Sequence, residues 1–200
     1  MSQKGVFIVL EGIDGSGKTT LAKAIRARME AKGFRTELTA EPTSGTIGSL
    51  LRSEKIGDPK AETLLFIADR SCHTAEISSM LDEGISVISD RYYASTLAYQ
   101  SAALEGPSFD YDLLEEMNRA VVREPDITIL LDLDPEESAG RVSGRGERLS
   151  KFERLEFQRR VRDNYLRIAE KHGFTILDAS CPKEELCDKA MERIDSILRW

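Results

Sequence analysis

Five apolar segments of strand length recur along the chain, and residues with helical periodicity separate each from the next. The segments show little polar alternation, which is typical of strands buried on both faces of a parallel sheet. This order favours an open α/β sheet with right-handed crossovers. The expected strands are 5–10, 36–40, 85–89, 127–131 and 174–177, and the expected helices are 20–31, 62–82, 110–123, 149–171 and 183–198.

Three glycines support these boundaries, because Gly33, Gly84 and Gly173 each stand between an expected helix and the next strand. Glycine is the residue that most easily closes the C-terminal end of a helix. Two hundred residues are enough to build a real hydrophobic core. The chain contains no internal repeat, linker or break in composition, so we expect residues 1–200 to form a single domain.

Composition excludes several classes of protein. No uninterrupted apolar run is longer than that from Val6 to Leu10, which is too short to cross a bilayer or to form a signal-peptide core. Cys72, Cys181 and Cys187 are too scattered for a disulfide scaffold, which favours reduced thiols and a cytoplasmic location. We therefore expect no association with a membrane.

The charge is unevenly distributed. The net charge is −7, yet residues 141–167 carry nine Lys or Arg against four Asp or Glu. A nucleic-acid-binding domain would be dominated by positive charge, so we expect no nucleic-acid partner. The basic segment indicates either a local anion site or a solvated helix of mixed charge.

A glycine-rich motif follows the first expected strand and opens the first expected helix. It matches G-x-x-x-x-G-K-[ST] in full, and a chance match in a chain of this length has a probability of roughly 1%. Such glycines let backbone N–H groups surround phosphate oxygens, while the lysine reaches the β- and γ-phosphates and the hydroxyl ligates Mg²⁺. An incidental lysine in a glycine turn is the alternative. The predicted ATP-binding residues are Gly12, Ile13, Asp14, Gly15, Ser16, Gly17, Lys18, Thr19 and Thr20.

This motif, the P-loop, places the chain in a three-layer α/β fold of the P-loop NTPase type, with a central five-stranded parallel sheet. Asn118 and Asn164 are the only asparagines, and neither begins the Asn-Lys-x-Asp motif of a guanine-nucleotide switch. The LSGGQ-like signature of transporter ATPases is also absent from the sequence. Of the classes of P-loop protein considered, a small kinase that acts on a metabolite remains.

Asp90 and Arg91 follow the third expected strand, where ligand-binding residues of a parallel sheet collect. The guanidinium of Arg91 can bridge phosphate oxygens, and Asp90 can orient it or hold Mg²⁺-bound water. Alternatively, Asp90 caps a helix as half of an ordinary ion pair.

Together these motifs resemble the thymidylate kinase family, in order and at plausible separations from about Val6 to Ala179. The residues that carry the resemblance are GIDGSGKTT at 12–20, Glu41-Pro42-Thr43, Leu65 to Arg70, DRYYASTLAYQ at 90–100 and the basic segment from Arg141 to Tyr165. The resemblance implies transfer of the γ-phosphoryl group of Mg·ATP to dTMP, which gives dTDP and ADP for dTTP synthesis. It also implies a homodimer.

The resemblance assigns roles to single residues. Phe66 would stack on thymine and Arg70, one helical turn later, would donate to the base. Thr96 would reach the pyrimidine edge, and Tyr99 would lie beneath the sugar, where a 2′-hydroxyl would clash. Asp14 would meet the 3′-hydroxyl. Taken singly, these residues also fit a packed helix or, for Asp14, a turn.

One departure concerns the acceptor phosphate. Related sequences often place an arginine beside the Glu-Pro pair, but here Ala40 precedes Glu41 and residues 36–51 contain no basic residue. Either Arg91 and Arg52 hold the phosphate alone, or the chain binds it more weakly.

The basic segment resembles a mobile lid at about 141–152, inserted within the domain. Gly15 stands where one branch of the family has a P-loop arginine, so we expect Arg145 in the lid to reach the transferring phosphoryl group, with Arg141 as its partner. The alternative is a solvated, salt-bridged loop and helix. The predicted catalytic residues are thus Lys18, Arg91, Arg141 and Arg145, and the predicted metal site is Thr19 with Asp90.

Two other functions stay open at this point: a kinase for a different nucleotide or nucleoside, and a nucleotide-binding module without catalysis. His73 and His172 are expected at the surface or at helix ends rather than in catalysis or metal binding.

Overall fold

The computed structural model describes residues 4–53, 55–104, 110–141 and 151–198, with no side-chain detail at 151–153. The sequence predicts one helix after each strand, and the structure has one or two helices after each. The elements are β1 (Phe7–Glu11), α1 (Lys18–Ala31), β2 (Thr36–Ala40), α2 (Thr46–Arg52), α3 (Pro59–Asp82), β3 (Ser86–Asp90), α4 (Tyr93–Ala103), α5 (Tyr111–Arg119), β4 (Ile127–Asp132), α6 (Pro135–Arg141), α7 (Lys151–His172), β5 (Thr175–Asp178) and α8 (Lys183–Ile197).

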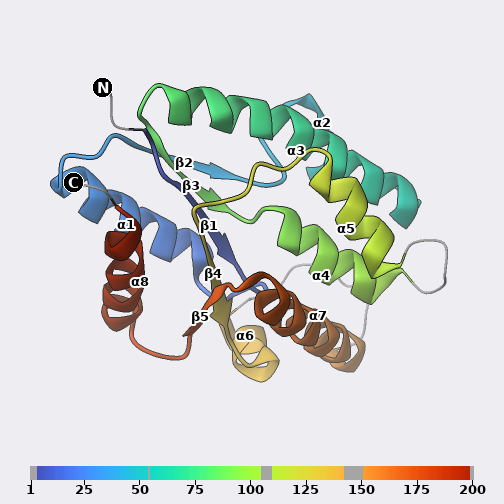
Figure 1. Ribbon diagram of the computed structural model, residues 1–200. Helices are drawn as coiled ribbons and strands as arrows, with labels where there is room; N and C mark the ends of the chain where they lie inside the picture. The colour runs from blue at the N-terminus through green and yellow to red at the C-terminus, as the bar shows by residue number, and fades with distance from the viewer. Residues whose placement is uncertain (1–3, 54, 105–109, 142–150, 199–200) are drawn as a thin grey trace.

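The five strands form one parallel sheet in the order β2-β3-β1-β4-β5. Helices α1 and α8 cover one face, and α3, α4 and α7 cover the other (Figure 1). This arrangement confirms the predicted three-layer α/β fold.

Burial on both faces explains the apolar strand sequences. Residues Phe7 to Leu10 of β1 are at most 1% exposed, and residues 87–89 of β3 and 129–131 of β4 are at most 2% exposed. The three glycines predicted to end helices have φ values of 90°, 76° and 70°, in the left-handed region that side chains disfavour. They lie at Gly33, Gly84 and Gly173.

The structure differs from the sequence prediction at several boundaries. The helix expected over 110–123 ends at Arg119, and a short helix, α6, begins at Pro135, with the Asp134 carboxylate accepting from the N–H of Glu136. Helices α2, α4 and α6 were not among the expected helices. Strands β1 and β3 each run one residue further, so that the carboxylates of Glu11 and Asp90 stand at their carboxyl ends.

Within the described residues, no helix is both long and apolar enough to cross a bilayer.

Candidate functional site

The P-loop curls between β1 and α1 as a ring of backbone groups. Gly12, Gly15 and Gly17 have φ values of 143°, 75° and 95°, and a Cβ atom at Gly12 would lie 2.6 Å from the carbonyl oxygen of Leu131. The positive φ values therefore favour glycine at all three positions, and at Gly12 the close approach of Leu131 also excludes a side chain. The loop ends at the N-terminus of α1, which favours an anion.

Lys18 is held inside this loop. Its Nζ atom donates to the carbonyl oxygens of Gly12 and Ile13 at 3.0 and 2.9 Å. Burial lowers the pKa of Lys18 to about 7, although Asp90 and Asp14 oppose this shift. The side chain of Ile13 is buried in the core, so only the backbone of this residue faces the loop.

Thr19 and Asp90 are brought together at the mouth of the loop. The Thr19 hydroxyl donates to Oδ2 of Asp90, which ends β3. A hydroxyl and a carboxylate are hard oxygen ligands of the kind that Mg²⁺ takes, usually with substrate phosphates and water completing its coordination. The pair thus fits Mg²⁺.

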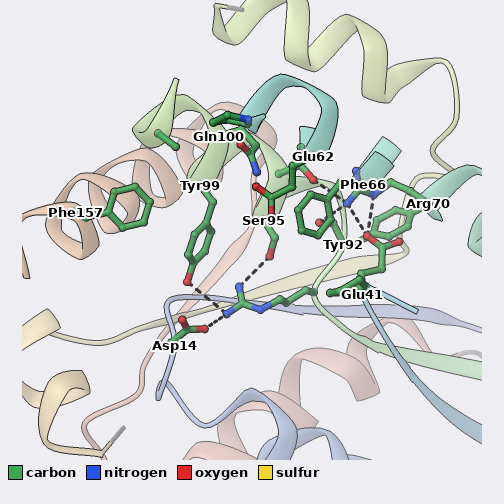
Figure 2. A pocket seen from close by; sticks show the side chains of 15 residues that line it. Asp14, Glu41, Glu62, Phe66, Arg70, Tyr92, Ser95, Tyr99, Gln100 and Phe157 are labelled. Carbon is green, nitrogen blue, oxygen red and sulfur yellow. Dashed lines mark hydrogen bonds and ion pairs between the residues drawn. The ribbon is translucent and has the colours of Figure 1, made fainter. Parts of the chain in front are cut away.

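Arg91 lies between the P-loop and a cavity. Its φ of 77° is unusual for a residue with a side chain, and such strain persists only where the surroundings fix it. Nη1 donates to the carbonyl of Gly12 at 3.2 Å and to the hydroxyl of Ser95 at 3.1 Å. Nη2 donates to Oδ1 of Asp14 at 2.5 Å. Figure 2 shows Asp14, Ser95 and Tyr99 converging at this point.

The cavity has a volume of about 400 Å³ and opens between α3 and α4, with the P-loop at one end. Phe66 and Arg70 of α3 both line it, as their spacing of four residues predicts, and Thr96 and Tyr99 of α4 line it as well. Figure 2 shows Tyr99 on the side of the cavity away from Arg70. The other lining residues are Asp14, Glu41, Pro42, Pro59, Glu62, Arg91, Tyr92, Ser95, Gln100, Ala103 and Phe157.

Arg70 is 1% exposed, and its donors are directed at protein groups. Both Nε and Nη2 donate to Oε2 of Glu41, at 2.9 and 2.6 Å, and Nη1 donates to Oδ1 of Asn118 at 2.5 Å. Nη2 also donates to the hydroxyl of Thr96 at 3.0 Å. These contacts fix the guanidinium at the cavity wall, where the sequence predicted that it would meet a base.

His73 corrects the sequence analysis, because it is 2% exposed rather than at the surface. Its Nδ1 atom lies 2.9 Å from Oε1 of Glu41, and its Nε2 atom lies 2.6 Å from the hydroxyl of Thr39. Glu41 thus has Arg70 on one oxygen and His73 on the other. His172, by contrast, lies near the end of α7 as expected.

Several predicted residues lie elsewhere. Arg52 donates to the carbonyl oxygens of Pro42 and Thr43 and does not line the cavity. Arg141, at the end of α6, donates to the carbonyl of Ala179 at 3.1 Å and pairs with Glu137. Arg145, with most of the predicted lid, lies outside the described residues.

Sequence reasoning did not single out Glu41, Gln100, Phe157, Glu11 or Tyr165, which line the cavity or hold the residues that do. Glu41 was visible within the Glu-Pro pair after the second strand, and Gln100 within the motif after the third. Phe157 and Tyr165 lie on α7, far along the chain, and had no local signal.

The chain is also similar in sequence to known proteins over most of its length. The sequence profile described as Thymidylate kinase matches residues 10–190. A protein named thymidylate kinase from Carboxydothermus hydrogenoformans is 40% identical over 92% of this chain and 93% of its own. Proteins named probable thymidylate kinase from Archaeoglobus fulgidus and Pyrococcus horikoshii are 40% and 46% identical, over 96% and 84% of each chain. The chain belongs to the thymidylate kinase family.

Proposed function

We propose that this protein transfers the γ-phosphoryl group of Mg·ATP to dTMP, with the P-loop holding the donor and the cavity between α3 and α4 holding the acceptor. The observation that carries the proposal is the position of Arg91, which touches the P-loop through Gly12 and the cavity through Asp14 and Tyr99. One cation thus stands between the two sites.

The reaction needs no protein base. An oxygen of the acceptor phosphate is already anionic, so it attacks the γ-phosphorus directly. The bond between the γ-phosphorus and the β,γ-bridging oxygen of ATP breaks, and that oxygen leaves with ADP. Charge then spreads over the phosphoryl oxygens, and catalysis consists of positioning and neutralising that charge. Lys18 and Arg91 are the cations that we assign to this task, together with Arg145 and Arg141.

Thr19 and Asp90 are the residues that would hold Mg²⁺. When bound, Mg²⁺ supplies charge neutralisation to the donor phosphates. The hydrogen bond between the two side chains supports this assignment, because it holds both oxygens side by side at the mouth of the P-loop.

The residues that line the cavity suit a nucleotide with a planar base and a deoxyribose sugar. Phe66 offers a ring for stacking, while Arg70, fixed by Glu41, lines the same wall. Tyr99 lies near Arg91, with its ring centre 5.2 Å from the guanidinium carbon, and would occupy the space that a 2′-hydroxyl needs.

A coupled assay of ADP release over dTMP, dUMP, dCMP and UMP tests the proposal. We expect dTMP to have the highest kcat/KM and Lys18→Met to abolish turnover. A chain that binds ATP but phosphorylates none of the four would be a nucleotide-binding module, and a preference for dCMP or UMP would assign a different acceptor.

A homodimer, which follows from the resemblance, and a cytoplasmic location, which follows from the scattered cysteines, remain predictions. Sedimentation velocity tests the first, and fractionation of cells tests the second.

A further inference from the structure

Glu11 is a buried carboxylate that the mechanism above does not use. It ends β1 next to the P-loop and is 0% exposed. Burial raises the pKa of its carboxyl group, while hydrogen bonds from Ser95, Tyr92 and Tyr165 and the charge of Arg91 oppose the shift. An isolated buried charge would be costly, so its partners matter.

Four donors converge on this carboxylate. The backbone N–H groups of Tyr92 and Ser95 donate to Oε1 at 2.9 and 3.2 Å. The hydroxyls of Ser95 and Tyr165 approach Oε2 at 2.6 and 3.0 Å. An ionised carboxylate can only accept, and this set of donors suits it.

The two hydroxyls also contact Arg91, whose guanidinium can only donate. Nη1 lies 3.1 Å from Oγ of Ser95 and 3.2 Å from the hydroxyl oxygen of Tyr165. Each hydroxyl can therefore accept from Arg91 and donate to Glu11, and the two hydroxyl oxygens also lie 2.8 Å apart, within hydrogen-bonding distance of each other. The result is a polarised path from cation to anion through two hydroxyls, in which each bond strengthens the next.

The two hydroxyls differ in origin. Ser95 belongs to α4, four residues after Arg91, whereas Tyr165 reaches the same atoms from the middle of α7. Its side chain is 1% exposed and its ring packs edge-on against Tyr99 at 6.2 Å. Burial holds the pKa of Tyr165 well above its ordinary value, so its hydroxyl keeps the proton that it donates.

We propose that Tyr165 is a positioning residue for phosphoryl transfer: its hydroxyl, anchored by Glu11, fixes Nη1 of Arg91 so that Nη2 faces the acceptor cavity. This inference rests on the proposed function, because it assigns Arg91 to the acceptor phosphate. Tyr165 itself does not line the cavity.

Tyr165→Phe tests the proposal, since it removes one oxygen and keeps the ring. We expect kcat to fall about 10-fold, because a displacement of about 1 Å at a reacting group can cost up to 10²-fold. The KM for dTMP should rise severalfold, while the KM for ATP should change less than twofold because Lys18 keeps its partners. The matched control is Tyr93→Phe, another buried tyrosine, whose ring packs on His172 and Phe174 away from the cavity.

Glu11→Gln tests the same path from its other end. We again expect a lower kcat and a higher KM for dTMP, with little change in the KM for ATP. Melting temperatures of the variants distinguish a structural role from a positioning role. A purely structural role would lower the melting temperature but leave kcat and the KM for dTMP of the folded enzyme unchanged. That outcome in both variants would overturn the positioning role. If the parent and Tyr93→Phe both leave dTMP unphosphorylated, the proposed function has failed instead.

Discussion

The carboxylate of Asp14 accepts from Nη2 of Arg91 at 2.5 Å, yet the two side chains differ in exposure, at 59% and 18%. The outer partner can therefore exchange with solvent or ligand, whereas Nη1 of Arg91 is held by groups inside the protein. The guanidinium of Arg91 is thus held in place through Nη1, whereas a ligand can replace the partner of Nη2. An anion that enters the cavity meets a guanidinium already oriented toward it.

Arg91→Lys should lower kcat for dTMP phosphorylation by roughly 10²-fold, the usual loss when one donor to a developing charge is removed. Lysine keeps the charge but not the fork, so it cannot serve Gly12, the hydroxyls and an incoming phosphate together. Steady-state kinetics with both substrates varied give the measurement. Arg119→Lys, an exposed residue of α5, is the control. A lysine variant with parental kcat would remove Arg91 from the reaction.

Local pattern was enough to predict the P-loop, the sheet and the shared face of Phe66 and Arg70, since each depends on neighbours in sequence. The partners of buried charges were not predictable in this way. His73 was expected at the surface because no neighbouring residue on α3 indicates its contact with Glu41. That contact forms because Glu41, which follows β2, lies beside α3 in the folded chain. Tyr165 lies 154 residues from Glu11, so only the packing of α7 against the sheet joins them.

The pKa of Lys18, near 7, predicts that ATP binding takes up protons in mildly alkaline solution. At pH 8 much of the lysine in the free protein is neutral, and the triphosphate favours its charged form, so protons enter as ATP binds. Affinity should weaken as pH rises from 7 to 9. Calorimetric titrations in buffers of different ionisation enthalpy measure the uptake. Lys18→Arg stays charged throughout and should show none; equal uptake in both proteins would assign it to another group.

Tyr99→Ala should weaken discrimination against ribose. The ring occupies the cavity wall beside Arg91, and its removal leaves room for a 2′-hydroxyl. We expect the ratio of kcat/KM for dUMP to that for UMP to fall by about 10-fold or more, within the range that one steric group controls. Tyr99→Phe keeps the ring and should keep the ratio. Loss of the ratio in Tyr99→Phe as well would point to the hydroxyl and not to the ring.

Arg70→Met should destabilise the fold as well as the cavity wall. The change leaves the Glu41 carboxylate buried with His73 but without the guanidinium that binds its Oε2 atom twice. Breaking a buried ion pair on one side costs about 3–5 kcal/mol of unfolding free energy, because the remaining charge is uncompensated. Urea denaturation measures this loss. Arg28→Met is the control, since its pair with Asp188 is exposed and should leave the midpoint unchanged. If the two variants unfold at the same urea concentration, Arg70 does not stabilise the buried Glu41.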